Sequence, residues 1–290
     1  MRAAVSEAGD LPMKITGATR LYAIVGDPIA QVRSPQVYSE RFAAAGIDAV
    51  LVPVHILAAQ FEAVFSQLLQ IANLDGVLVT APFKVRAVTF AQRVGMSGRA
   101  VGAVNALRRD PDGVWSADMF DGLGFVRGAE RKGNRIQGRR VALFGAGGAG
   151  SAIACALGGA GAASIDLIEP DQAKASALIG RLRQLFPAQR FTIASSVPAA
   201  TDMVVNASPV GTRDGDGLPG EIGDLDQSTV IGDVVISEAP TPIIQLAMKR
   251  GYSWVAGRDM HSGQVDALLD FFGQPSAPAD AGRSNALLSK

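Results

Sequence analysis

The chain has 290 residues, 48% of them hydrophobic, and its 27 Lys and Arg balance its 27 Asp and Glu. This length supports one large core or two moderate ones, and the neutral balance gives no general attraction to nucleic acid or to an anionic membrane. No apolar run reaches the roughly 18 residues that span a bilayer, and Glu7, Asp10 and Pro12 interrupt the N-terminal segment, where a secretory signal needs an apolar core. We therefore expect a cytoplasmic globular protein that binds neither nucleic acid nor membrane.

Strands and helices are predicted to alternate in the first part of the chain. Short apolar runs indicate strands, and Ser34-Pro35 offers a helix N-cap followed by a first-turn proline. The expected elements are strands at 21–25, 50–54 and 76–80 and helices at 34–45 and 58–71. Because such alternation is typical of a parallel sheet, we predict an α/β unit here.

A second α/β unit is predicted over 122–256. The expected elements are strands at 140–144, 163–168, 191–194, 203–206 and 230–235, and a helix that begins at Thr241-Pro242 and ends at Arg250. A last amphipathic helix, 259–272, follows the completed unit, so we expect it to return to the first one. The tail from Gly273 onward is rich in Pro, Ala, Ser and Asp and is expected to be frayed.

The segment 141–150 carries the clearest functional signal. It reads V-A-L-F-G-A-G-G-A-G, which places G-x-G-x-x-G between a predicted strand and the helix-forming 151–157. In such a loop the first glycine permits a tight turn, the second lets backbone N–H groups approach a pyrophosphate, and the third allows close helix packing. We predict a Rossmann-type dinucleotide site with these contacts: Gly145, Ala146, Gly147, Gly148 and Ala149.

Glu169 indicates which dinucleotide binds. It ends the next predicted strand, 19 residues after Gly150, and no Lys or Arg follows it before Lys174. A carboxylate accepts hydrogen bonds from a free ribose 2′-hydroxyl but repels a 2′-phosphate, so we expect NAD to be preferred over NADP. The alternative is that Glu169 and Asp171 merely cap the following helix.

Several motifs in one order resemble the shikimate dehydrogenase family. The similar segments are G-D-P-I-A-Q-V-R-S-P at 26–35, V-T-A-P-F-K at 79–84, G-A-V-N at 102–105, D-G at 121–122 and N-A-S-P-V-G at 206–211. The resemblance covers roughly 21–272. It implies a substrate domain formed by 1–121 and completed by 257–290, and an NAD-binding Rossmann domain formed by 122–256.

The resemblance also implies roles for individual residues. Lys84 and Asp121 would be the catalytic pair, because hydride removal from a secondary alcohol leaves a hydroxyl proton that a lysine beside a carboxylate can relay. The alternative for Lys84 is a solvated helix lysine, which its place at a strand-to-helix turn disfavours. Without the resemblance, Asp121 would be an ordinary N-cap for the helix that begins near Gly122. The implied substrate contacts are Ser34, Thr80, Asn105 and Gln264. Arg33 is either a substitute hydrogen-bond donor to the substrate carboxylate or a surface arginine. The further cofactor contacts are Asn206, Ala207, Ser208 and Gly257.

Five positions depart from the family pattern. Val32 replaces the first of two serines that hold the substrate carboxylate, and Leu78 replaces an asparagine. Met119-Phe120 stand in place of Asn-Thr, and Ile236 in place of a substrate-facing tyrosine. A pocket that loses these donors together has a weaker polar grip on a polyhydroxy acid. We therefore expect a divergent member of the family.

We expect an NAD-dependent oxidoreductase that acts on a small cyclic hydroxy acid, shikimate or quinate, as a monomer or homodimer. A single cysteine and two isolated histidines predict no metal site, although His261, one turn before Gln264, would face the same side of its helix. The alternatives are an aminoshikimate dehydrogenase and a non-catalytic sensor of dinucleotide and small acid. A folate-type methylene dehydrogenase is disfavoured by Pro-Phe-Lys and Gly-Ala-Val-Asn.

Overall fold

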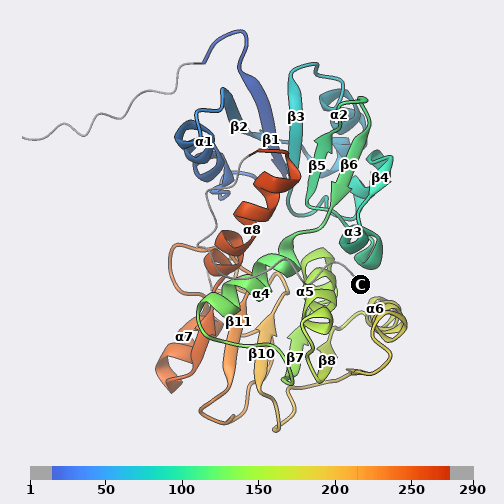
Figure 1. Cartoon of the computed structure of the whole chain (residues 1–290). Coiled ribbons are helices and arrows are strands. Elements are labelled where there is room, and N and C mark those ends of the chain that lie inside the picture. Colours follow the sequence, from blue (N-terminus) through green and yellow to red (C-terminus); the bar gives the residue numbers. More distant parts are fainter. Residues whose placement is uncertain (1–14, 214, 275–290) are drawn as a thin grey trace, which may run out of the picture.

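Two six-stranded sheets form the framework of the protein (Figure 1). The computed structural model describes residues 15–213 and 215–274. The strand order is β2-β1-β3-β5-β6-β4 in the first sheet and β12-β11-β10-β7-β8-β9 in the second. Within these residues, no helix has both the length and the apolar character that a membrane crossing requires.

The first sheet is mixed rather than parallel. Its elements are β1 (Arg20–Gly26), α1 (Ser34–Ala44), β2 (Ala49–His55), the 3-10 turn η1 (Ala58–Gln60), α2 (Phe61–Leu68), β3 (Leu74–Val79), η2 (Arg86–Phe90), β4 (Arg93–Val94), α3 (Met96–Val101), β5 (Ala106–Arg109) and β6 (Trp115–Asp118). The predicted parallel pairing is confirmed for β1 with β2 and β3, but β5 pairs antiparallel with both β3 and β6. Strands β5 and β6 were not predicted, because each has only four residues and carries polar side chains, too short a pattern to indicate a strand.

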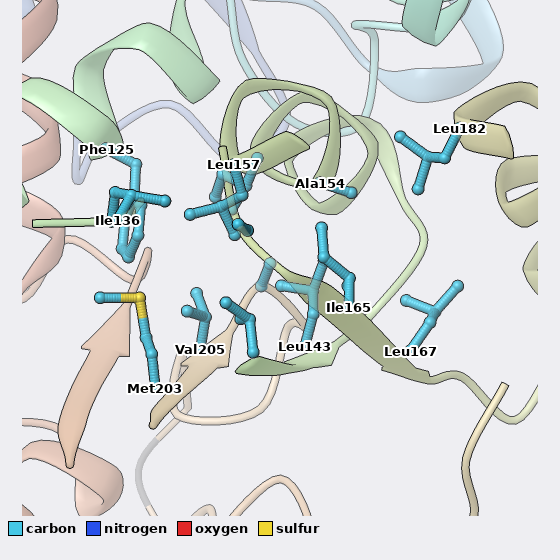
Figure 2. Packing of buried hydrophobic residues seen from close by; sticks show 14 of the residues in the cluster. Phe125, Ile136, Leu143, Ala154, Leu157, Ile165, Leu167, Leu182, Met203 and Val205 are labelled. Atoms are coloured by element: carbon cyan, nitrogen blue, oxygen red, sulfur yellow. The ribbon is translucent and has the colours of Figure 1, made fainter. Parts of the chain in front are cut away.

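The second sheet is parallel throughout, as predicted. Its elements are β7 (Arg140–Phe144), α5 (Gly148–Gly159), β8 (Ser164–Ile168), α6 (Gln172–Leu185), β9 (Arg190–Ile193), β10 (Met203–Asn206), β11 (Val230–Asp233), α7 (Pro242–Arg250) and β12 (Ser253–Val255). Figure 2 shows Leu157 and Ala154 of α5 above Leu143, Ile165 and Val205 of the strands, all of them buried. This packing fixes the start of α5 at the carboxyl end of β7.

Helices α4 (Asp121–Arg131) and α8 (Gly257–Phe271) link the two sheets (Figure 1). They pack so closely that a Cβ on Gly124 would lie 2.6 Å from the Met260 carbonyl oxygen. Met260 belongs to the core of the second sheet, whereas Leu268 and Phe272 pack into the core of the first, so the last helix returns as predicted. It begins two residues before the predicted start because Asp259 accepts a hydrogen bond from the Ala256 N–H and caps the first turn. The tail predicted to fray lies, beyond Gln274, outside the described residues.

Candidate active site

The glycine loop between β7 and α5 has the shape that a dinucleotide needs. Gly145 has a φ of +97°, and a Cβ on Gly150 would lie 2.1 Å from the Gly145 carbonyl oxygen, so both positions require glycine. A Cβ on Gly147 would meet no atom within 4 Å, which leaves this side of the loop open. Gly147 is also the N-cap of α5, and no side chain caps that helix, so the N-terminal N–H groups remain available to an anion. These residues fit a pyrophosphate.

Glu169 lies at this loop. Its Oε2 accepts from the Ala146 N–H at 2.8 Å, and its Oε1 accepts from the Asp171 N–H at 3.0 Å. The N-cap of α6 is Asp171, which accepts from the N–H groups of Ala173 and Lys174. The capping alternative is therefore right for Asp171 and wrong for Glu169, whose carboxylate stands beside the glycine loop at the end of β8.

Asn206 holds the turn that packs against the glycine loop. It is fully buried at the end of β10, where its Nδ2 donates to the Asp233 carboxylate at 3.1 Å. Its Oδ1 accepts from both the N–H and the hydroxyl of Ser208. The turn that it holds brings the Ala207 carbonyl oxygen to 2.7 Å from where a Cβ on Gly145 would lie. Asn206 thus positions the predicted cofactor contacts Ala207 and Ser208 against the glycine loop.

The end of β11 supports the same region. Asp233 is buried, and desolvation raises its pKa although Thr241, Val235 and Asn206 donate hydrogen bonds to it. Gly257, the first residue of α8, packs on the backbone that follows β11, since a Cβ there would lie 2.3 Å from the Val235 carbonyl oxygen. Gly257 is therefore a close-approach position next to the cofactor loops.

Lys84 and Asp121 form an ion pair where the two sheets meet. Lys84 lies in the turn after β3, and its side chain is 18% exposed, whereas that of Asp121 is 3% exposed. The lysine stem also touches the glycine loop, because a Cβ on Gly148 would lie 3.4 Å from the Lys84 Cβ. The N-cap alternative for Asp121 is wrong: Phe120 is the N-cap of α4, and the Asp121 side chain accepts from Lys84 and Asn105 instead.

Asn105 extends the pair into a buried network. Its Nδ2 donates to Asp121 at 2.8 Å and to Gln264 Oε1 at 3.2 Å, and its Oδ1 accepts from the Phe120 N–H at 2.9 Å. Asn105 and Gln264 are both buried. Thr80 lies four residues before Lys84, and within the described part of the chain its hydroxyl has no hydrogen-bond partner. The structure therefore brings together four of the residues that the sequence assigned to catalysis and substrate.

Ser34 contacts α8 at His261, a residue for which no role was predicted from the sequence. Its Oγ lies 3.3 Å from Nε2 of His261, one turn before Gln264. Burial lowers the pKa of His261 below its usual value near 6.5, and the nearby Asp121 carboxylate opposes that shift. The position of His261 beside Gln264 was the only signal available from the sequence.

The side chains of Arg33 and of the residues that depart from the family pattern lie outside this hydrogen-bonded network. Arg33 forms an ion pair with Glu238, beyond β11, and both side chains are exposed, so the structure does not bring this guanidinium to Asp121. Val32, Leu78 and Phe120 pack into one apolar cluster beneath α8. Three of the substitutions of polar by apolar residues therefore share one cluster, whereas Met119 is buried in a separate cluster with Ala152, and Ile236 is exposed.

No group of three or more His, Cys, Asp or Glu that could hold a metal ion occurs within 15–213 and 215–274. The parallel sheet carries a glycine loop, and a carboxylate lies at the end of the next strand. Together with the partly buried lysine–carboxylate pair beside that loop, these features define a nicotinamide dinucleotide-dependent dehydrogenase.

Comparison with known proteins identifies which dehydrogenase family this is. Residues 24–107 match the model of the shikimate dehydrogenase substrate binding domain. The shikimate dehydrogenase (NADP(+)) of Rubrobacter xylanophilus is 32% identical over 85% of this chain and 88% of its own. That of Dinoroseobacter shibae is 30% identical over 82% of this chain and 86% of its own. The chain belongs to the shikimate dehydrogenase family.

Solved structures show the same fold. Shikimate 5-dehydrogenase from Listeria monocytogenes, in complex with shikimate and NAD, matches with a TM-score of 0.80 at 24% identity, over 91% of this chain and 95% of that one. Quinate dehydrogenase from Corynebacterium glutamicum, in complex with NAD, gives 0.79 at 24% identity over 89% and 95%. The 5-ketofructose reductase of a Gluconobacter strain gives 0.78 at 25% identity over 89% and 95%.

Proposed function

We propose that the protein interconverts a small cyclic hydroxy acid and its ketone, that shikimate or quinate is the substrate, and that NAD is the preferred cofactor. The observation that carries the proposal is the partly buried Lys84–Asp121 pair, which lies beside Gly148 of the glycine loop. This observation supports Lys84 as the proton-transfer group beside the predicted dinucleotide site. Asn105 and Gln264 complete the network at the residues implied for substrate binding.

The chain's own groups handle the proton. The nicotinamide, when bound, supplies the hydride acceptor or donor. During oxidation the O–H bond of the substrate breaks and the neutral amine of Lys84 takes up the proton, while the Asp121 carboxylate stabilises the ammonium that forms; the carbonyl forms as hydride leaves the carbon. Asn105 holds the other oxygen of Asp121 at 2.8 Å and so keeps the carboxylate aimed at the lysine. Reduction follows the same path in reverse.

The preference for NAD depends on Glu169. Its carboxylate is fixed by two backbone N–H groups at the end of β8, and a 2′-phosphate placed there would meet its negative charge. The two curated relatives are named for NADP(+), so this residue is where we propose that the chain departs from them. The proposal is tested by comparing kcat/KM for the two cofactors.

The proposal assigns substrate binding and dinucleotide binding to different parts of the chain. Residues 1–121, completed by 257–290, would bind the substrate, and 122–256 would bind the dinucleotide. The passage of α8 from the second core to the first supports this division within the described residues. The cytoplasmic location and the monomeric or dimeric state stay predictions from the sequence.

A second candidate is a polyhydroxy ketone that lacks a carboxylate. Val32 carries no donor for a carboxylate, and the similar 5-ketofructose reductase is named for such a ketone. The sensor alternative is disfavoured because the Lys84–Asp121 pair and its hydrogen bonds are complete. Aminoshikimate remains a hydroxy acid to be included in the assay.

One experiment separates these candidates. Reduction of NAD and of NADP is followed with shikimate, quinate and aminoshikimate, and oxidation of NADH and NADPH is followed with 5-ketofructose. The Lys84→Met variant serves as the inactive control. We expect turnover with a hydroxy acid and NAD. Turnover with the ketone alone would favour the second candidate, and dinucleotide binding without any turnover would favour the sensor.

A further inference from the structure

His261 is the polar side chain of α8 that the proposed mechanism leaves unused. Its imidazole is largely buried, and Tyr38 of α1 meets it edge-on at a ring separation of 6.5 Å. Its contact with Ser34 Oγ is the only hydrogen bond of the imidazole within the described residues. A polar ring that served only to pack against Tyr38 could be replaced by an apolar side chain, because withdrawing ring nitrogens from water in exchange for one long contact costs free energy.

The position of the imidazole connects two parts of the proposed site. On one side is Ser34, the hydroxyl that remains in the opening motif. On the other is Asp121, whose carboxylate is close enough to act on the imidazole electrostatically. Gln264, one turn further along the same face of α8, is tied to Asp121 through Asn105. His261 therefore contacts Ser34 of the segment implied to hold the substrate's acid group and is near enough to Asp121 of the catalytic pair to feel its charge.

The spacing of Ser34 and His261 suits an oxygen ligand. A separation of 3.3 Å is long for an N–H···O hydrogen bond, so the contact between them is weak and can be exchanged for stronger ones. An N–H and an O–H held side by side in this way can each donate to an oxygen of one carboxylate. Val32, two residues before Ser34, offers no such donor.

We propose that His261 is a specificity-determining substrate contact, whose Nε2 and the Ser34 hydroxyl together bind the carboxylate of the hydroxy acid in place of the donor that Val32 lacks. This inference rests on the proposed function. Burial lowers the pKa of the free imidazole and so favours its neutral form, which binds as a hydrogen-bond donor. A chain with two serines in its opening motif would not need it.

The kinetic test compares three variants on the same helix. His261→Leu removes the donor and keeps an apolar side chain for packing, His261→Gln places an amide nitrogen near the original Nε2, and the exposed Ser262→Ala is the matched control. We expect His261→Leu to raise KM for the accepted hydroxy acid about tenfold or more, with kcat within about threefold and KM for NAD unchanged. His261→Gln should recover part of the loss, and Ser262→Ala should match the wild type.

Binding is read independently of activity. The chain has two histidines, so a ¹⁵N spectrum of the imidazoles contains two sets of signals, and His55, which pairs with Asp27, is an internal reference. The probes are shikimate and quinate, added to the wild-type protein and to His261→Gln. We expect the probe that is turned over to shift the His261 signals and to leave those of His55 in place.

The outcomes separate the inference from the function on which it rests. Turnover of a hydroxy acid together with unshifted His261 signals and an unchanged KM in His261→Leu would overturn the inference and leave the proposed function standing. Absence of turnover with every hydroxy acid would overturn both. If His261→Leu does not fold, the wild-type spectrum and the His261→Gln kinetics decide the question.

Discussion

Replacing Lys84 with methionine tests the catalytic pair most directly. Methionine preserves the stem that packs 3.4 Å from where a Cβ on Gly148 would lie, and it removes only the ammonium group. A general acid–base group contributes about 10²- to 10⁴-fold to turnover, which corresponds to about 2.7 to 5.4 kcal/mol of transition-state stabilisation at 1.36 kcal/mol per factor of ten. We expect kcat to fall by that factor while the Kd for NAD stays within about twofold, since no cofactor contact is lost.

The same substitution has a cost in stability that the structure allows us to place. Asp121 is 3% exposed and would be left with Asn105 as its remaining side-chain partner. Removing one member of a buried ion pair costs about 3 to 5 kcal/mol, and the surviving hydrogen bond from Asn105 together with the partial exposure of Lys84 favours the lower end, about 3 kcal/mol. Adding Asp121→Asn removes the stranded charge and should restore part of this free energy of unfolding.

Two assays check the reasoning. Chemical denaturation of the wild type, Lys84→Met, Asp121→Asn and the double variant gives the coupling free energy of the pair. Steady-state kinetics on the same four proteins should show a double variant no slower than Lys84→Met, because the two groups act as one unit. A Lys84→Met enzyme that kept more than half of the wild-type kcat with its best substrate would refute the catalytic role.

The other predictions concern the cofactor, the loop and the polar end of the site. NAD should exceed NADP by at least about tenfold in kcat/KM, a difference of about 1.4 kcal/mol, and Glu169→Gln should narrow that ratio; equal use of NADP by the wild type would contradict the proposal. Gly150→Ala should abolish dinucleotide binding because its Cβ would lie 2.1 Å from a backbone oxygen, whereas Gly148→Ala, whose nearest contact is 3.4 Å, should retain most of it in a calorimetric titration. Val32→Ser should lower KM for an accepted hydroxy acid by restoring a charge-assisted hydrogen bond of about 1.5 to 3 kcal/mol; an unchanged KM in this variant would place the carboxylate elsewhere. Burial lowers the pKa of His261, so an NMR titration should find this pKa below 6.5. As the pH falls below 6.5, the unfolded chain binds a proton at this position before the folded protein does. The free energy of unfolding should therefore decrease with falling pH in this range.

The sequence alone determined the features that depend on local order. The glycine loop, the parallel strands on either side of it and the start of α5 follow from residues that are neighbours in the chain, where turn chemistry and hydrophobic periodicity act directly. Glu169 was placed by its distance from the loop, and the motif order pointed to Lys84 and Asp121. The antiparallel strands β5 and β6 were not predicted, because strands of four residues gain their stability from their pairing partners and not from their own sequence pattern.

Only the tertiary structure decided how the site is assembled. Lys84 and Asp121 are 37 positions apart, and Asn105 and Gln264 are 159 apart, yet each pair shares a hydrogen bond. The contact between Ser34 and His261 joins residues 227 positions apart, and it exists because α8 runs from the second core back to the first. No local pattern encodes such distances, since they arise when glycines on α4 and α8 let the two helices pack at backbone contact and the apolar end of α8 buries itself in the first sheet.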